Sequence, residues 1–209
     1  MQENESLNDQ AKQSVINEKI ATIKQNLRPI ISERSYRENH QELFTLASGK
    51  KSPYYFDLKQ TLMDPLYLKM AAKGLHLLMQ QKLSYLPKAA GGLTMGADPL
   101  VYTVSLLSTH EESVVYPLVV RKATKDHGSK KRIEGRLSQI QPEDRVVLID
   151  DVITTGGSTL QAYEVLKEAG LKIDAAFCVL DRKEGGAENF ASHGINLYPL
   201  FELEDFASK

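Results

Sequence analysis

The chain has 209 residues, and its 26 basic and 27 acidic side chains give a formal net charge of −1. This length suits one α/β domain with a sizeable core, and the balanced charge argues against a broad nucleic-acid-binding surface. No apolar run approaches the ~20 residues of a membrane span, and the polar N-terminus lacks the apolar core of a secretory signal. The single cysteine, Cys178, excludes an internal disulfide and a cysteine metal cluster. We therefore expect a cytoplasmic protein that binds neither nucleic acid nor membrane.

The N-terminal region is polar, and its first dozen residues are expected to be frayed. Apolar residues then recur at near-helical spacing from Ser14 to Leu27, which predicts an amphipathic helix that packs on the domain or on a partner. A second helical stretch is expected to continue to about Asn39. Residues 1–34 are thus expected to form a tail and helix, and residues 35–209 the main domain.

The segment from Phe44 to Lys59 reads FTLASGKKSPYYFDLK. A short apolar entry, a Ser-Gly turn and a run of aromatic residues are typical of a β-hairpin with cross-strand packing. The same pattern also suits a small hood, at about residues 40–62, over a flat heterocycle. Asp64 and Pro65 then favour the start of a covering helix that reaches Gln81.

Two further segments follow in the chain. The first is a strand from Lys88 to Thr94 with a small-residue turn, GGLTMGADP, which by itself is weak evidence for a phosphate site. The second is a strand from Ser113 to Val120 that runs into the basic segment RKATKDHGSKKRIEG. No helical or strand period survives across this segment, so a long loop from Arg121 to Gly135 is expected. Taken alone, such a loop also fits a solvated basic surface.

The most informative stretch is Val146 to Thr159, which reads VVLIDDVITTGGST. Its four leading apolar residues predict a strand that is buried on both faces and stops at Asp150 and Asp151. The following turn is rich in glycine and hydroxyl groups and leads into a helical pattern, which is the arrangement of an anion site. Carboxylates beside such a site need hydroxyl donors or a metal ion to face, and a ribose diol supplies the donors. The stretch therefore predicts a sugar-phosphate site.

These motifs resemble those of the orotate phosphoribosyltransferases, a branch of the type I phosphoribosyltransferases. The strand, the acid pair and Thr-Thr-Gly resemble the motif that binds 5-phosphoribosyl-1-pyrophosphate (PRPP). The segment from Phe44 resembles the family's base-binding segment, and Arg-Lys-x-x-Lys-Asp-His-Gly resembles its catalytic loop. The resemblance covers about Ser35 to Leu203. It implies the type I phosphoribosyltransferase α/β fold: a mostly parallel central sheet flanked by helices, with a small N-terminal hood.

The resemblance also implies an activity, in which PRPP and orotate give orotidine 5′-monophosphate and pyrophosphate during pyrimidine (UMP) biosynthesis. Mg2+ would be held mainly through PRPP, with no protein metal ligands. The implied catalytic residues are Lys125, His127 and Asp151. Those implied to bind PRPP are Arg121, Lys122, Lys125, His127, Asp150, Asp151, Val152, Ile153, Thr154, Thr155, Gly156, Gly157 and Ser158, with Thr155 to Thr159 fixing the 5′-phosphate. Those implied to bind orotate are Tyr55, Phe56, Thr154 and Arg182. In the family the loop from Arg121 to Gly135 reaches the neighbouring active site, which implies a homodimer.

Two departures from the family pattern concern lysines. Several relatives carry lysine where this chain has Ala47, and some carry a Tyr-Lys pair where it has Met95 and Gly96. Those cations are therefore absent here or supplied from elsewhere.

Two alternatives remain open at this point. A phosphoribosyltransferase for another base, such as a purine, would need no carboxylate clamp at Arg182 and no basic loop of this pattern. A non-enzymatic PRPP-sensing regulator should carry a nucleic-acid surface. The near-neutral charge and the lack of a helix-turn-helix pattern speak against the regulator.

Overall fold

The computed structural model describes residues 2–45, 49–110, 114–122 and 132–207, with side chains from Gln10 onward. Its helices and strands are α1 (Gln2–Arg34), β1 (Tyr36–Glu38), β2 (Phe44–Thr45), β3 (Lys51–Ser52), β4 (Tyr54–Phe56), α2 (Lys59–Leu62), α3 (Pro65–Lys82), β5 (Ala89–Leu93), α4 (Asp98–Ser108), β6 (Tyr116–Val120), β7 (Ile133–Gly135), β8 (Arg145–Ile153), α5 (Gly157–Glu168), β9 (Lys172–Asp181), α6 (Gly186–Ala191) and β10 (Asn196–Glu202). No helix in these ranges is long and apolar enough to cross a membrane.

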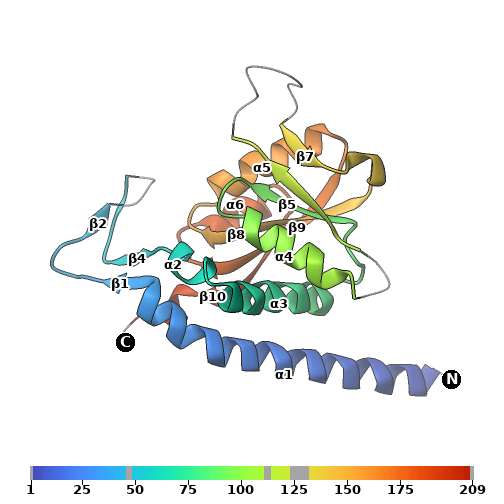
Figure 1. Cartoon of the computed structure of the whole chain (residues 1–209), viewed down its shortest axis with the longest axis horizontal. Coiled ribbons are helices and arrows are strands. Elements are labelled where there is room, and N and C mark those ends of the chain that lie inside the picture. Colours follow the sequence, from blue (N-terminus) through green and yellow to red (C-terminus); the bar gives the residue numbers. More distant parts are fainter. Residues whose placement is uncertain (1, 46–48, 111–113, 123–131, 208–209) are drawn as a thin grey trace.

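The centre of the molecule is a six-stranded sheet with the order β10-β9-β8-β5-β6-β7 (Figure 1). The first five strands are parallel and β7 is antiparallel to β6, which confirms the predicted mostly parallel α/β sheet. The chain runs outward from β5 to β6 and then returns to the other side of β5 as β8. Ligands bind in such folds beyond the carboxyl ends of the strands, at the point where the strand order reverses. That point lies between β5 and β8.

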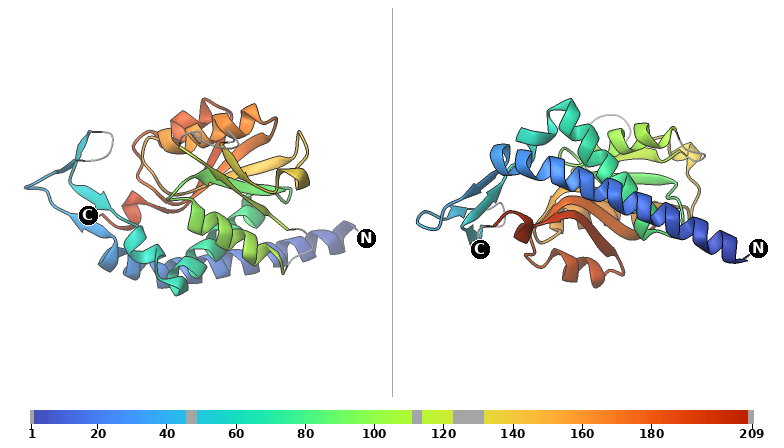
Figure 2. Two further views of the ribbon diagram at one scale, coloured as in Figure 1. Left: turned by 45° about the horizontal axis from the view of Figure 1, so that its top comes forward. Right: turned by 90° about the horizontal axis from the view of Figure 1, so that it is seen from below.

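Helices cover both faces of this sheet. α1, α3 and α4 lie on one side, and α5 and α6 lie on the other (Figure 2). β8 contributes side chains to the hydrophobic cores on both faces of the sheet. Val147 and Ile149 pack in the core beneath α3 and α4, whereas Val146 and Leu148 pack in the core beneath α5. All four side chains are fully buried, as the unbroken apolar run predicted.

The N-terminal region differs from the expectation of a frayed tail. A single helix, α1, runs from Gln2 to Arg34, and its first turns are rich in Gln, Glu, Lys and Ala, which favour helix formation. Ile16, Ile20 and Leu27 are buried among residues of α3, whereas Val15 stays 48% exposed. The expected amphipathic helix is therefore present, but it is longer than its apolar pattern.

The helical stretch expected to continue to about Asn39 is helical only as far as Arg34, as the end of α1. Residues Tyr36–Glu38 form β1, which pairs antiparallel with β4. The Tyr36 ring lies 4.9 Å from the ring of Phe56 and 6.2 Å from that of Phe206, between their centroids. Packing against aromatic residues far away in sequence therefore determines the extended conformation here.

The hood consists of two small antiparallel pairs, β1 with β4 and β2 with β3, and projects beside the main sheet (Figure 1). The hairpin expected in this segment is present as β2 and β3, while Ala47 lies outside the described residues. After the hood, the Asp64 carboxylate accepts from the backbone N–H of Leu66 at 3.0 Å and Pro65 is the first residue of α3. The predicted helix start is therefore confirmed.

The basic segment was expected to be a loop as far as Gly135. Its end instead forms β7, in which Ile133 pairs with Val120 and Gly135 with Leu118. Ile133 is buried, and this single apolar residue gives too short a pattern to predict a strand.

Candidate active site

Asp150 and Asp151 lie within the last part of β8, which continues to Ile153 rather than ending at the acids. Asp150 is buried, and its carboxylate accepts from the Thr159 hydroxyl at 2.5 Å and from the backbone N–H of Asp151 at 3.0 Å. The Asp151 carboxylate accepts from the backbone N–H of Val152 at 2.8 Å and remains partly exposed. The two acids therefore present one enclosed and one accessible carboxyl group.

The environment of Asp150 favours its neutral form. Burial is the main cause, and the adjacent charge of Asp151 adds to it, so that the pKa of Asp150 is raised to about 8. The hydrogen bond from Thr159 acts in the opposite direction. Near neutral pH the folded state therefore favours the neutral Asp150 carboxyl group.

We expect Asp150→Asn to flatten the dependence of stability on pH. The folded Asp150 keeps its proton up to about pH 8, whereas an unfolded aspartic acid loses it near pH 4. Between these values the folded state binds more protons, so the free energy of unfolding falls with rising pH by up to about 1.4 kcal/mol per unit. Urea denaturation from pH 5 to pH 9 measures this slope. Glu168→Gln, on the exposed face of α5, is the matched control, and an unchanged slope in Asp150→Asn would contradict the assignment.

The turn after β8 encloses a cavity of about 260 Å³ at the N-terminus of α5. Its lining residues are Asp150, Val152, Ile153, Thr154, Thr155, Gly156, Gly157, Ser158, Thr159 and Gln161. Gly156 has φ +80°, and a Cβ there would lie 3.0 Å from the Phe190 ring, so this position requires glycine. The first N–H groups of a helix lack intrahelical partners, which makes this cavity suited to an anion. The Thr159 hydroxyl is already bonded to Asp150 and is not free to hold a phosphate.

A second cavity of about 310 Å³ adjoins the first and shares three of its lining residues. It is lined by Lys59, Leu93, Thr94, Met95, Gly96, Lys122, Asp150, Asp151, Val152 and Ser158. A Cβ on Gly96 would lie 2.8 Å from a carboxylate oxygen of Asp151, so the turn after β5 lies directly against the acid. The acid pair thus lies where two cavities meet, one with helix N–H groups and one with two lysines. Lys59 ends the segment expected to form the hood, and its position at this cavity could not be predicted from that segment alone.

Arg182 follows β9 directly and is 4% exposed. Its Nη2 donates to the Ser52 hydroxyl at 3.1 Å and to the Tyr54 carbonyl at 3.0 Å, and it pairs with the Glu184 carboxylate at 2.8 Å. Its Nε is buried and has no hydrogen-bond partner among the described residues. The guanidinium is therefore a fixed, enclosed cation that ties the sheet to the hood, and not a surface arginine in a charged turn. Its partners in the hood could not be predicted from local sequence.

The two aromatic residues of the predicted base site differ in position. Tyr55 is 39% exposed, and its ring centroid lies 5.5 Å from that of Phe44. Phe56 is buried in the hood, where its ring contacts Tyr36 and Phe206. Tyr55 is thus accessible and Phe56 is not, and neither residue lines either cavity.

The basic segment is described only at its two ends. Lys122 lines the second cavity, and an Arg121 guanidinium nitrogen lies 3.4 Å from the Glu134 carboxylate. Lys125 and His127 lie outside the described residues.

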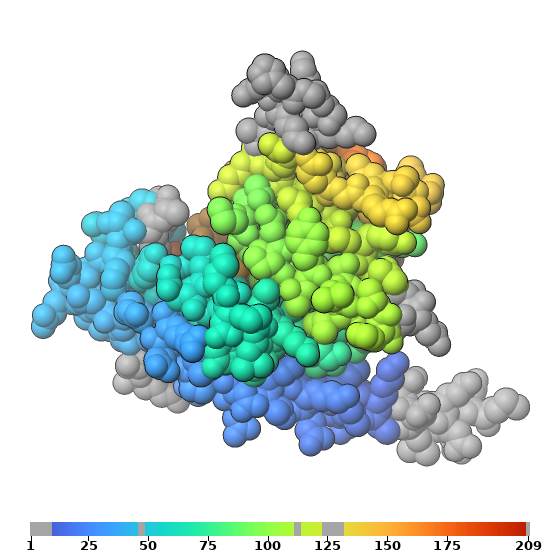
Figure 3. Space-filling model, viewed as in Figure 1, coloured from blue at the N-terminus to red at the C-terminus, as the bar shows by residue number. Residues whose placement is uncertain are grey.

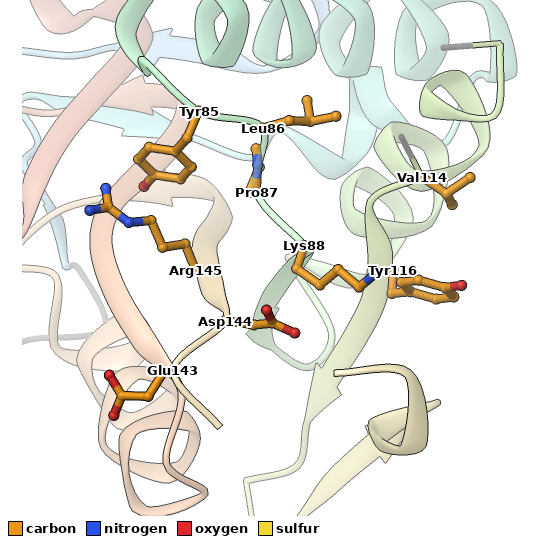
Figure 4. Close-up of a pocket in the computed structure, with 9 residues that line it drawn as sticks. All are labelled: Tyr85, Leu86, Pro87, Lys88, Val114, Tyr116, Glu143, Asp144 and Arg145. Carbon is orange, nitrogen blue, oxygen red and sulfur yellow. The ribbon is translucent and has the colours of Figure 1, made fainter. Parts of the chain in front are cut away.

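A larger cavity, of about 520 Å³, lies at the opposite edge of the sheet, where β5, β6 and β8 begin (Figure 4). The Arg145 guanidinium lies 4.3 Å from the centre of the Tyr85 ring and pairs with Asp174 at 3.0 Å. Glu143 pairs with Lys172, and the Asp144 carboxylate accepts from a backbone N–H. Arg145 and Glu143 are thus paired within the protein, and the amino ends of parallel strands are not where such folds bind ligands. The active site is therefore assigned to the carboxyl edge.

Comparisons with known proteins identify the family of this chain. No family model matches the chain. An orotate phosphoribosyltransferase of Aquifex aeolicus is 41% identical over 182 residues, which are 87% of this chain and 96% of that protein. One from Leptospira biflexa is 40% identical over 174 residues, 83% of this chain and 92% of that protein. The crystal structure of the Mycobacterium tuberculosis orotate phosphoribosyltransferase matches with a TM-score of 0.68 at 26% identity, covering 89% of this chain and 99% of that one. The chain therefore belongs to the orotate phosphoribosyltransferase family.

Proposed function

We propose that this protein transfers the 5-phosphoribosyl group from PRPP to orotate, giving orotidine 5′-monophosphate and pyrophosphate for UMP biosynthesis. The observation that carries the proposal is the acid pair Asp150–Asp151, which lies between two anion-suited cavities at the edge where the buried cation Arg182 also lies. PRPP has the matching shape, since a ribose separates a phosphate from a pyrophosphate.

In this proposal the 5′-phosphate occupies the cavity at the N-terminus of α5, held by N–H groups and hydroxyls from Thr154 to Ser158. The ribose hydroxyls donate to Asp150 and Asp151. The pyrophosphate occupies the second cavity, against the turn after β5 and Lys122. Arg121, Lys125 and His127 are proposed to add positive charge and donors around the leaving group, which lowers the barrier because that charge grows in the transition state.

Orotate is proposed to lie beneath the hood, with its carboxylate on Arg182 and Thr154 and its ring near Tyr55. A guanidinium suits a carboxylate because it offers two parallel N–H donors. The orotate ring nitrogen forms a bond to the anomeric carbon as the bond from that carbon to pyrophosphate breaks, and the nitrogen loses its proton. Positive charge develops on the ribose, and the accessible carboxylate of Asp151 is placed to stabilise it.

Mg2+ is proposed to be held mainly through PRPP oxygens. The described residues contain no group of three or more His, Cys, Asp or Glu side chains that could hold a metal ion. The Asp151 carboxylate offers a hard oxygen ligand at the cavity, which fits an ion that keeps waters and phosphates as its other ligands. When bound, the ion would neutralise part of the pyrophosphate charge.

A homodimer, with the Arg121–Gly135 loop reaching the neighbouring active site, is part of the proposal. Figure 3 shows α3 and α4 side by side on one face of the molecule, and five large apolar side chains in or next to α2, α3 and α4 are more than half exposed. They are Met63, Leu66, Met95, Tyr102 and Leu106. Met95 belongs to the turn that lines the second cavity, so a second copy packed against Met95 would lie close to the site. The cytoplasm is the proposed location, since the only cysteine, Cys178, is buried and unpaired.

The loss of orotate absorbance in the presence of PRPP and Mg2+ tests the activity. We expect turnover with orotate and none with adenine or hypoxanthine, because a purine has no carboxylate for Arg182. Specific activity should fall when the protein is diluted below its dimerisation constant. Turnover of a purine would indicate a transferase for another base. PRPP binding without turnover of any base would support a sensor instead.

A further inference from the structure

Lys59 is the last residue of the segment that resembles the base-binding segment and has no role in that resemblance, yet it lines the second cavity together with Asp150 and Asp151. It is the first residue of α2, directly after the hood strand β4 and its connection. In the described part of this cavity the charged groups are the two acids, Lys59 and Lys122. Two lysines therefore face two carboxylates, one of which favours its neutral form.

The position of Lys59 is fixed by its neighbours. Leu58 is 1% exposed, and Thr61 is fully buried with its hydroxyl 2.7 Å from that of Ser35. The Asp57 backbone N–H donates to the Ser35 carbonyl at 2.9 Å. Buried residues on both sides thus hold the short helix α2 against the end of α1 and leave Lys59 directed at the cavity.

The charge of Lys59 is maintained by acids. Its ammonium lies 2.7 Å from a carboxylate oxygen of Asp57, and its side chain is 57% exposed. The hydrogen bond to Asp57 is the main cause that raises the pKa of Lys59, and the charge of Asp151 adds to it. Lys59 therefore stays protonated at neutral pH and keeps two further N–H donors for a ligand.

The turn after β5 cannot supply such a cation itself. A side chain at Gly96 would meet the Asp151 carboxylate at 2.8 Å, and Met95 before it is apolar. A pyrophosphate placed against this turn would lie beside two acids, and it needs positive charge from another element to be held there. Lys59 is the cation that α2 places at that cavity.

We propose that Lys59 binds the pyrophosphate group of PRPP from within the same chain, in the cavity formed by the β5 turn and the acid pair. The assignment rests on the proposed function and identifies an additional substrate-binding residue for it. Lys59 supplies a permanent charge on a rigid element of the same chain, beside Lys122, whereas the basic loop beyond Lys122 is proposed to come from the partner subunit. Binding of PRPP should then depend on Lys59 even before orotate or a partner loop engages.

Equilibrium binding to Lys59→Met tests this, with PRPP, ribose 5-phosphate and pyrophosphate as probes at fixed Mg2+. Loss of a charged hydrogen bond to phosphate should weaken PRPP and pyrophosphate binding by about 10- to 100-fold. Ribose 5-phosphate, which lacks the pyrophosphate, should bind as it does to the wild type. Lys59→Arg should restore most of the PRPP affinity. Lys88→Met, at the opposite edge of the sheet, is the matched control and should change none of the three.

Three results would overturn the assignment of Lys59 to the pyrophosphate. If Lys59→Met weakens the binding of ribose 5-phosphate as much as that of PRPP, Lys59 maintains the shape of the site and does not bind the pyrophosphate. Asp57→Asn tests the same alternative, because it removes the charge that pairs with Lys59 and keeps the Lys59 cation. A loss of PRPP affinity equal to that in Lys59→Met would also show that the role of Lys59 is structural. If no probe is affected, Lys59 does not contact the ligand. A wild type that binds PRPP but consumes no orotate would refute the proposed function and leave the binding test of Lys59 intact.

Discussion

Replacing Arg182 with methionine is expected to lower kcat/KM for orotate by at least about 30-fold, because truncating one partner of a buried charge pair costs about 2–5 kcal/mol. Arg182 is 4% exposed and is held by the Ser52 hydroxyl and the Tyr54 carbonyl, so its guanidinium is positioned before the substrate arrives. Glu184 pairs with it at 2.8 Å in the structure and would compete with the substrate carboxylate. Steady-state kinetics at varied orotate measure the loss.

The control for Arg182 is its neighbour Lys183. Lys183 pairs with Glu202 at 2.6 Å and is 40% exposed, so Lys183→Met removes an adjacent cation outside the proposed site. PRPP affinity should be retained in Arg182→Met, which separates loss of the base site from general unfolding of the hood. An Arg182→Met protein with unchanged KM and kcat for orotate would contradict the carboxylate assignment.

Asp151→Asn is expected to lower kcat by about 10²- to 10³-fold, the size of effect seen when one preorganised electrostatic group is removed from a transition state. The substitution keeps the shape of the side chain and removes the charge that faces the developing positive charge on the ribose. PRPP affinity should fall much less, because an amide oxygen still accepts from a ribose hydroxyl. Single-turnover measurements of orotidine 5′-monophosphate formation give the chemical step directly.

Two comparisons test the role of Asp151. Asp144→Asn changes an acid at the opposite edge of the sheet and should leave turnover unchanged. Asp150→Asn should cost less than Asp151→Asn, because Asp150 is enclosed and favours its neutral form. Equal losses in kcat and in PRPP affinity for Asp151→Asn would instead assign this residue to ground-state binding.

The local features of the fold were predictable because each depends on residues close together in the chain. The apolar run before Asp150 predicted a strand buried on both faces, and the glycine-rich turn after it predicted the helix N-terminus that encloses the phosphate-sized cavity. Asp64 and Pro65 predicted the start of α3 for the same reason. In these segments backbone preferences and hydrogen bonding between near neighbours agree with the final structure.

What the sequence alone determined about this protein is therefore its family, its parallel α/β sheet and the acid pair with its phosphate turn. Only the tertiary structure decided that Phe56 packs inside the hood, that Tyr36–Glu38 form a strand, that Lys59 reaches the cavity and that Arg182 is held by Ser52 and Tyr54. Each of these depends on contacts between residues far apart in the chain, whose free energy comes from burial and pairing in the folded state. Local propensity does not contain that information, because the same residue can be exposed or buried according to what packs against it.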